Sequence, residues 1–393
     1  MQIIFFDLSE QRKSMLPLSY TRVLSDLRIG ILKISEKWTN RLGIDQISYL
    51  TEDYLQEKFP CYESDENIFI QSNVCPNDIL LGEIMRLEDK DVLMAGETIL
   101  AFRGTIEQFM QQDWNYVEYN GEFLQVSHPW EIFQHNGSEM EYDFAWLTAG
   151  RNSEPISGTN RVLNPSQVFI EPGAQVECAI LNANNGPIYI GKDAEVMEGS
   201  VVRGPFALCE HGVLKLATKI YGPTTIGPHS KVGGEVNNSV ILGYSNKGHD
   251  GFLGNSVLGE WCNIGADSNN SNLKNNYAEV RLWSYASGRY APTGLQFCGL
   301  IMGDHSKCGI NTMFNTGTVV GVSSNIFGGG FPRNFIPSFS WGGSAGFTEY
   351  KLNKVFEVAE KVMERRSIDF DEVEQNILKA VFERSAQYRS SYK

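Results

Sequence analysis

The sequence predicts three parts: an α/β domain, a parallel β-helix and a helical C-terminal extension. Short apolar runs alternate with helix-like stretches through residues 1–150, which is typical of a layered α/β domain. Apolar residues then recur every six positions between residues 168 and 328, and two amphipathic stretches follow residue 351. A chain of 393 residues has room for two or three such domains.

The α/β domain is expected to span residues 1–150, and a polar linker with prolines and a glycine is expected at residues 151–165. Ile3–Phe6 has the pattern of a buried strand, and apolar residues between Leu24 and Trp38 follow at helical spacing. Further strands are expected at the short apolar runs 47–50, 68–70, 92–94 and 99–102.

The β-helix is expected to span residues 166–335. A strict recurrence of six fits neither an α-helix nor a simple alternating strand. A small residue commonly stands four positions after each apolar one and would share the interior, because two bulky side chains would exceed close-packed density there. Glycine often comes next after the apolar residue and lets the backbone turn. The longest uninterrupted run comprises Ile190, Val196, Val202, Leu208, Leu214, Ile220, Ile226 and Val232.

The C-terminal extension is expected to span residues 336–393 and to contain two amphipathic helices. Apolar residues lie on one face between Leu352 and Met363, and on another between Phe370 and Phe382. Ser367 is the expected N-cap of the second helix. These helices would close an open end of the β-helix or pack on a neighbouring subunit.

The net charge of -14 comes from residues 1–150, since acidic and basic side chains are equal in number after that point. An acidic surface repels polyphosphates, so nucleic-acid binding is not expected. The seven cysteines show no CxxC spacing, which fits reduced thiols and no metal site. Neither a signal peptide nor a membrane-spanning run is recognisable, which predicts a cytoplasmic protein without a membrane partner.

Side chains able to do chemistry gather where the six-residue recurrence is expected to break, between Val232 and Phe252. Glu235 and His249 lie there. Repeat proteins often place function at such an interruption.

This region resembles the acetyltransferase domain of the GlmU family, which are bifunctional N-acetylglucosamine-1-phosphate uridyltransferases and glucosamine-1-phosphate acetyltransferases. In that family a glutamate precedes a loop that ends in a catalytic histidine, and an N-I-G-A run follows. Two departures bear on the acceptor, because Phe252 replaces a tyrosine and Asn237 a lysine that contacts substrate. The matching segments, without gaps, are Gly234–Val236, Lys247–Gly254, Cys262–Ala266 and Ser271–Asn272.

The resemblance implies a left-handed β-helix and a role for each matching residue. His249 would be the base that takes a proton from the attacking amine, a task that suits an imidazole near neutral pH. The backbone N–H of Ala266 would support the thioester carbonyl of acetyl-CoA as negative charge develops. Glu235 and Asn272 would orient the sugar amine, and Lys219 would contact the substrate phosphate. The substrate-binding residues expected on this basis are Lys219, Glu235, Phe252, Asn263 and Asn272.

Plainer interpretations of the same residues stay open. A histidine in a glycine-flanked loop is commonly a surface residue, and a lysine on an outer coil face, such as Lys219, is commonly only solvated. The stretch 269–276 is rich in asparagine and could be a polar loop or an asparagine ladder. Three other histidines show no partner pattern and are expected to be surface or structural: His211, His229 and His305.

The resemblance extends weakly to residues 1–150. The usual family opening has a glycine-rich loop whose backbone amides hold a triphosphate, and the matching stretch Phe6–Leu18 has no glycine. It instead resembles a GlmU-related subfamily with R-x-x-x-L-P-L, T-R and L-R-x-G blocks. The domain would then either bind a sugar phosphate or nucleotide, with Mg²⁺ if it is active, or serve only as a scaffold. The candidate ligand-binding residues are Arg12, Lys13, Arg22 and Arg28.

Three functions fit the whole sequence. The first is an acyl-CoA-dependent N-acyltransferase for an amino-sugar phosphate, with or without sugar-1-phosphate nucleotidyltransfer. The second is a nucleotidyltransferase whose β-helix only oligomerises, and the third is a non-catalytic scaffold. The resemblance implies the first, with a place in UDP-N-acetylglucosamine biosynthesis and with acetyl-CoA as co-substrate. It also implies a homotrimer with active sites between neighbouring β-helices.

Overall fold

The computed structural model describes residues 1–392, which form two compact units. The first unit consists of Met1–Met15, Thr21–Leu27 and Leu32–His128. The second takes in Leu16–Tyr20, Arg28–Ile31 and everything from Pro129 onward. The helix α5 (Pro129–Thr148) therefore belongs to the second unit, although it precedes the boundary expected at residue 150.

The first unit is built on a six-stranded sheet with the order β2-β1-β3-β6-β5-β7. The strand β1 is parallel to both β2 and β3, whereas β6 is antiparallel to both β3 and β5. All four short apolar runs expected as strands, and the opening strand, are confirmed. The strands are β1 (Gln2–Phe6), β2 (Ile47–Leu50), β3 (Asn67–Gln71), β5 (Asp91–Ala95), β6 (Thr98–Arg103) and β7 (Asn115–Glu118).

Short helices accompany this sheet. The helix expected between Leu24 and Trp38 is only half right, because a 3-10 turn comes first and the α-helix begins at Ile34. Gly30 explains the interruption, since its φ of +74° cannot continue an α-helix. The remaining elements are α1 (Ser9–Ser14), η1 (Leu24–Asp26), α2 (Ile34–Leu42), η2 (Asp53–Leu55), β4 (Val74–Cys75), α3 (Asp78–Met85), α4 (Ile106–Gln111) and β8 (Leu124–Gln125).

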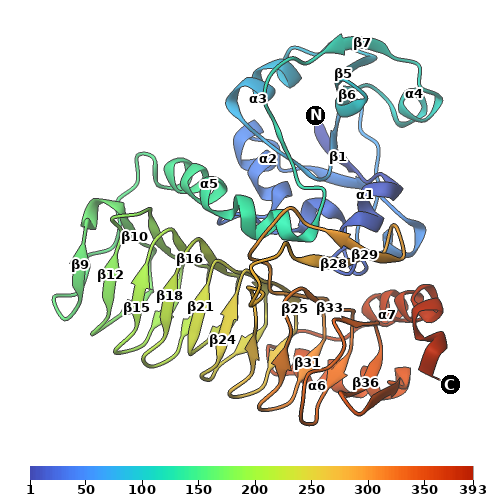
Figure 1. The fold of residues 1–393 in the computed structure, drawn as a ribbon. Coiled ribbons are helices and arrows are strands. Elements are labelled where there is room, and N and C mark those ends of the chain that lie inside the picture. The colour runs from blue at the N-terminus through green and yellow to red at the C-terminus, as the bar shows by residue number, and fades with distance from the viewer. Residues whose placement is uncertain (393) are drawn as a thin grey trace. The chain divides into compact units, whose positions relative to one another are not determined.

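The second unit is a parallel β-helix, which confirms the fold predicted from the six-residue recurrence. Its strands stack in steps along the coil (Figure 1) and form three sheets, here called sheets 1, 2 and 3. Sheet 1 comprises β10 (Val168–Ile170), β13 (Ile188–Ile190), β16 (Phe206–Leu208), β19 (Thr224–Ile226), β22 (Val240–Gly243), β25 (Val257–Glu260), β30 (Leu300–Met302), β33 (Thr318–Val320) and β35 (Phe335–Ile336).

Sheets 2 and 3 form the other two faces of the coil. Sheet 2 comprises β11 (Gln175–Val176), β14 (Glu195–Val196), β17 (Val213–Leu214), β20 (Lys231–Val232), β23 (Asn246–Lys247), β26 (Asn263–Ile264), β31 (Lys307–Cys308), β34 (Asn325–Ile326), β36 (Ser340–Gly343) and β37 (Gly346–Glu349). Sheet 3 comprises β9 (Arg161–Leu163), β12 (Ile180–Asn182), β15 (Val201–Arg203), β18 (Lys219–Tyr221), β21 (Glu235–Asn237) and β24 (Phe252–Gly254).

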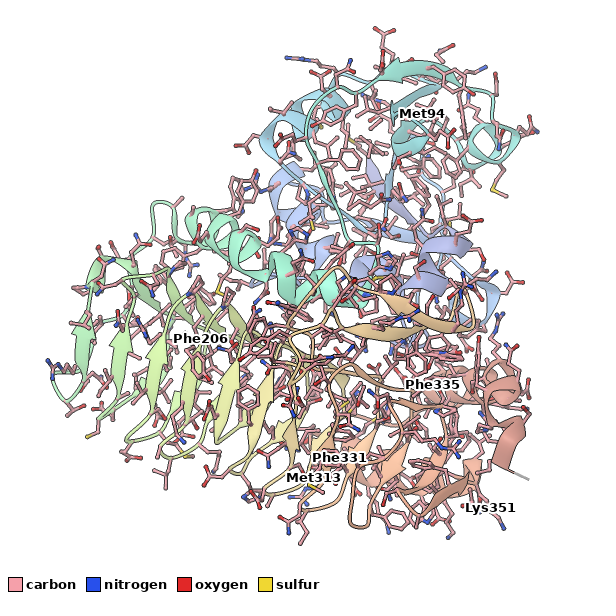
Figure 2. The ribbon with its side chains drawn as sticks, viewed as in Figure 1. Met94, Phe206, Met313, Phe331, Phe335 and Lys351 are labelled. Atoms are coloured by element: carbon pink, nitrogen blue, oxygen red, sulfur yellow. The ribbon has the colours of Figure 1, made fainter. Side chains whose placement is uncertain are left out.

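One apolar core runs along the inside of the coil. Each of the eight residues in the longest six-residue run is at most 1% exposed, as predicted. The small residues expected beside them also point inward, since Ala194, Ser200 and Ser230 are at most 1% exposed. Phe206, which Figure 2 labels, belongs to the same core cluster.

The six-residue recurrence does break between Val232 and Phe252, but the coil itself is not interrupted there and continues without a gap. Val236 and Ile241 are fully buried and fill the next two interior positions. The turns before Val236 and before Ile241 are two residues and one residue shorter than in the preceding coils. The spacing of six is therefore lost, although the strands still stack. Lys247 occupies the third interior position, where its register partner on the preceding coil is Val232.

The real insertion lies later, between β27 (Asn269–Asn270) and β30, and contains the antiparallel hairpin β28 (Arg281–Ser284) and β29 (Arg289–Pro292). It packs on β35 through Trp283, whose ring stacks on Phe335 with a centroid distance of 4.2 Å. After this insertion β32 (Met313–Phe314) pairs with β27 in place of a longer sheet 3.

The C-terminal helices α6 (Leu352–Glu364) and α7 (Glu372–Arg384) are confirmed, and η4 (Ala386–Tyr392) follows them. The N-cap of α7 is Asp371, whose carboxylate accepts a hydrogen bond from Glu374 N, so the expectation of Ser367 is wrong. Ser367 instead has a φ of +56° in the turn between the helices. Within residues 1–392, no helix combines the length and apolarity that crossing a bilayer requires.

Candidate functional site

A ladder of polar side chains runs along the outer face of sheet 2. Because side chains alternate along a strand, the residue before each interior residue points outward. Lys231 pairs with Asn246, Asn246 with Asn263, and Asn263 with Lys307 on successive coils. The outward face of sheet 2 therefore presents two amides between two amines.

This ladder forms one wall of a cleft of about 650 Å³. The opposite side is lined by the last turn of α6 and the residues that follow it, Val362, Arg365 and Arg366. Arg366 also donates hydrogen bonds to the His229 carbonyl at 3.5 Å and to Asn246 Oδ1 at 3.4 Å. The cleft thus lies wholly within the second unit.

The cleft is strongly cationic. None of the described residues that line it is acidic, whereas five carry basic side chains: Lys215, Lys231, Lys307, Arg365 and Arg366. Burial lowers the pKa of Lys307 to about 8. An anion bound beside Lys307 would favour the charged form of its amine. Together with the other basic side chains, this suits the cleft to phosphate or another polyanion.

Stacked aromatic rings line one edge of the cleft. The rings of Tyr244 and Trp261 lie in the turns between sheets 1 and 2, with centroids 4.4 Å apart and planes 17° apart. The stack extends to His229 on one side and to His305 on the other, and His211 stacks on His229. The three histidines without a partner pattern in the sequence thus share one ring ladder, in which Tyr244 and Trp261 each stack on a ring on both sides.

Three of the residues singled out from the sequence meet at this cleft. His249 is exposed and lies in the turn that joins β23 of sheet 2 to β24 of sheet 3, and it lines the cleft together with Asn263 and Ala266. The carbonyl of Ala266 accepts a hydrogen bond from Asn311 N at 2.8 Å. The His249 imidazole, the Asn263 amide and the backbone of Ala266 therefore border the same cationic cleft.

The other candidate substrate-binding residues lie on the adjacent face of the coil. Lys219, Glu235 and Phe252 are register partners on three successive strands of sheet 3. Asn272 continues this face, because its amide donates a hydrogen bond to Asn255 Oδ1 at 2.8 Å and lies over Gly254. The candidate residues thus form two groups on neighbouring faces, with His249 at the corner between them.

Sequence reasoning missed a partner of Glu235. The Tyr221 hydroxyl donates a hydrogen bond to Glu235 Oε1 at 2.6 Å. Partial burial and this hydrogen bond raise the pKa of Tyr221 to about 12. Tyr221 fixes one carboxylate oxygen and leaves the other for a ligand.

The asparagine-rich stretch after Asp267 completes the edge of sheet 3. The Asn269 amide oxygen accepts from Phe252 N, and the Asn270 amide oxygen accepts from Gly254 N, both within 2.9 Å. These side chains take over the backbone bonding that another strand would provide. Asn269 and Asn270 are therefore part of the coil and bond to its backbone, so this part of the stretch is neither a loose polar loop nor a stacked asparagine ladder.

The four cationic candidates of residues 1–150 do not form an exposed cluster. Arg12 and Arg22 are each 3% exposed and Arg28 is 5% exposed, whereas Lys13 is exposed. The Arg12 guanidinium pairs with Asp7 at 2.6 Å, and Arg22 pairs with Asp26 at 3.1 Å. Arg28 donates to the Ile31 carbonyl. A role in nucleotide binding stays a prediction for all four.

No group of three or more histidine, cysteine, aspartate or glutamate side chains within residues 1–392 is arranged to hold a metal ion. The free cysteines are mostly buried, and burial raises the pKa of Cys262 and of Cys298 to about 12. These two thiols are therefore protonated near neutral pH and are poor nucleophiles.

The cleft lysines could have been found from the sequence. A full coil has three strands, one on each face. Every third interior residue along the chain therefore lies on the same face, and the residues beside these point outward from that face. Lys231 precedes Val232 and Lys307 precedes Cys308, which are both interior residues of sheet 2. The arginines after α6 had no such signal, because their position depends on how the helix folds back.

The chain is similar to known proteins in both of its units. Residues 3–152 match the sugar nucleotidyl transferase family. The chain is also similar to a bifunctional sugar-1-phosphate nucleotidylyltransferase/acetyltransferase of Sulfurisphaera tokodaii, with 24% identity over 271 residues. That alignment covers 67% of this chain and 61% of the relative's length. The resemblance drawn from the sequence motifs is thereby confirmed.

Among solved structures, the chain matches the UDP-N-acetylglucosamine acyltransferase of Arabidopsis. The match covers 60% of this chain and 82% of that chain, with 14% identity and a TM-score of 0.25.

Proposed function

We propose that the protein is an acyl-CoA-dependent N-acyltransferase that acts on an amino-sugar phosphate, with His249 as the base. The observation that carries this proposal is the cationic cleft of about 650 Å³ that His249 borders. Coenzyme A is polyanionic, so the basic side chains that line the cleft suit its phosphates. The curated relative, which is named as an acetyltransferase, supports the same activity.

The acceptor would lie on the sheet 3 side of the corner. Lys219 is exposed there and would pair with a sugar phosphate, while Glu235, held by Tyr221, would accept a hydrogen bond from the amine. Phe252 would offer an apolar contact to the sugar ring. With donor and acceptor on either side of one turn, the imidazole of His249 would stand between them.

The proposed reaction moves the acyl group from the sulfur of acyl-CoA to the amine nitrogen of the sugar. The amine nitrogen attacks the thioester carbonyl, and His249 takes the proton that the nitrogen loses. The carbonyl oxygen gains negative charge, which the Ala266 N–H would stabilise. As the C–S bond breaks, the proton passes to the leaving thiolate, so that free coenzyme A and an N-acyl sugar phosphate form.

A second activity, sugar-1-phosphate nucleotidyltransfer, is proposed for the first unit. It is favoured by the match of residues 3–152 to the sugar nucleotidyl transferases. Mg²⁺ would then neutralise the phosphates of the nucleotide. Release of pyrophosphate from UTP or dTTP with sugar-1-phosphates tests this activity, and no release with any pair of substrates would leave the first unit as a scaffold.

The acyltransferase is tested by following free thiol with acetyl-CoA and glucosamine-1-phosphate. We expect stoichiometric thiol and an N-acetylated product in the mass spectrum. Glucose-1-phosphate is the matched control, because it has the same phosphate and no amine. Absence of thiol with every amino-sugar phosphate tried, or equal release with glucose-1-phosphate, would exclude the proposed reaction.

A further inference from the structure

We propose that Lys247 is a positioning residue that holds the turn carrying His249 in place from inside the coil. This inference rests on the proposed acyltransferase function. Lys247 is not among the residues that line the cleft, and its amine lies within the apolar core of the coil.

Lys247 stands in a column of interior residues. On the coils before it, the sheet 2 positions in register are Val196, Leu214 and Val232. Lys247 is only 2% exposed. An amine therefore replaces an aliphatic side chain at one level of an otherwise apolar column, directly beneath the His249 turn.

The amine reaches the turn through hydrogen bonds to the backbone. Lys247 Nζ donates to the His249 carbonyl at 3.0 Å and to the Gly233 carbonyl on the preceding coil at 2.9 Å. These two bonds join the His249 turn to the coil below it. Because the His249 side chain is exposed, its direction depends on how firmly its backbone is held.

Gly234 leaves the space that this arrangement needs. A Cβ on Gly234 would lie 2.9 Å from Lys247 Nζ and 2.8 Å from the His249 carbonyl oxygen. Gly234 also has a φ of +75°, in the region that disfavours other residues. The Gly233–Gly234 pair on one coil and Lys247 on the next thus fit each other.

Charged groups on both sides of the corner face the amine. Asp250 and Glu235 favour its protonated form, and Lys219 opposes it. The nearby Cys308 thiol lies in the interior on the same side. Burial outweighs these carboxylates and lowers the pKa of Lys247 to about 8. The amine thus bonds to the His249 turn and interacts electrostatically with residues proposed to bind the acceptor, so its loss should disturb the corner more than the distant coils.

The test compares Lys247→Met, Lys247→Gln and Leu214→Met in the full chain. Methionine fills the space but donates no hydrogen bond, whereas glutamine keeps an N–H donor. Leu214→Met is the matched control, since it is a volume-conserving change in the same column two coils away. Amide hydrogen exchange of residues 248–251 and the steady-state constants are measured for each folded variant.

We expect Lys247→Met to exchange at least tenfold faster at 248–251 and to lose at least tenfold in kcat, with KM for both substrates nearly unchanged. Lys247→Gln should recover part of both effects, and Leu214→Met should show neither. Unchanged exchange in folded Lys247→Met overturns the inference, as does faster exchange with unchanged kcat. If the unaltered protein releases no thiol, the proposed function fails, while the exchange data still decide whether Lys247 holds the turn.

Discussion

The Asp7–Arg12 pair lies almost out of reach of solvent, since the two side chains are 1% and 4% exposed. Asp7 also accepts hydrogen bonds from Leu24 N at 3.2 Å and from Thr51 Oγ1 at 2.6 Å. One carboxylate therefore joins β1, η1 and the end of β2 in the first unit. Such a network makes Arg12 a structural residue first, whatever else it does.

Arg12→Met should lower the free energy of unfolding by about 3–5 kcal/mol, because it leaves the buried Asp7 carboxylate without its main countercharge. The neighbouring exposed Lys13→Met is the control and should change it by no more than about 0.5 kcal/mol. Urea denaturation followed by circular dichroism measures both. Equal stability of the two variants would mean that the ion pair contributes nothing.

Lys247 should give the stability a distinctive pH dependence. Its folded pKa of about 8 lies below the value of 10.5 for an exposed lysine, so the folded state gives up this proton first. The contribution of Lys247 to stability therefore rises as pH increases through 8 toward 10.5. Relative to Lys247→Met, the unaltered protein should gain about 2 kcal/mol between pH 7 and pH 10.

This difference is measured by urea denaturation of both proteins at several pH values. Taking the difference cancels the titration of thiols and phenols, which both chains share. A constant difference across this pH range would show that the amine does not titrate there. An opposite slope would show that its pKa is raised.

At the residue scale, the sequence predicted some positions and missed others, while the roles of the site residues stay predictions. The motif around His249 pointed to the cleft because its turn glycines and neighbouring amides are local in sequence. Lys247 could not be recognised as an interior residue, since a search for apolar residues six apart passes over an amine. Tyr221 was missed for another reason: its bond to Glu235 joins two coils 14 residues apart.

Elements were predicted best where the period was strict. The coils between Ile190 and Val232 follow the spacing of six, so all eight residues of the recurrence are interior, although it passes over the buried Phe206. Where two turns shorten after Val232, the spacing failed although the sheets continue. The hairpin β28–β29 escaped notice because it packs by aromatic stacking and has no repeat of its own.

The end of α6 gives the cleft part of its charge. The double change Arg365→Glu and Arg366→Glu should raise KM for acetyl-CoA about tenfold or more, since each charge-assisted bond to phosphate is worth roughly 1.5–3 kcal/mol. The loss should shrink at high salt, where exposed charges are screened. Lys361→Glu is the matched control, because it reverses an exposed charge on the same helix outside the cleft lining.

Steady-state kinetics at low and high ionic strength decide this prediction. If Lys361→Glu raises KM as much as the double variant, only the overall charge of the molecule matters. If neither variant changes KM, the donor does not bind along α6.

At the scale of the whole molecule, we propose that a neighbouring chain completes the site. The candidate residues occupy two faces of one coil, and exposed apolar side chains flank the corner between them. Leu216 and Ile310, in the turns after β17 and β31, are 65% and 70% exposed. We propose these two side chains as contact positions for a neighbouring subunit.

The resemblance to the GlmU family implies a homotrimer, so we expect a mass about three times the 44.0 kDa of one chain by light scattering. Leu216→Asp should weaken the assembly, because it places a charge on the apolar surface. The exposed Lys192→Asp, on an earlier coil, is its control. A monomer at micromolar concentration would mean that one chain alone must complete the site.

The central claim is that His249 removes the proton from an amine at the cationic cleft. The most direct measurement is kcat for thiol release from acetyl-CoA with glucosamine-1-phosphate in the unaltered protein, His249→Ala and His211→Ala. The account predicts a loss of about 10²–10⁴ in kcat for His249→Ala, with KM for acetyl-CoA nearly unchanged and His211→Ala fully active. Full activity of His249→Ala, or an equal loss in His211→Ala, would contradict it.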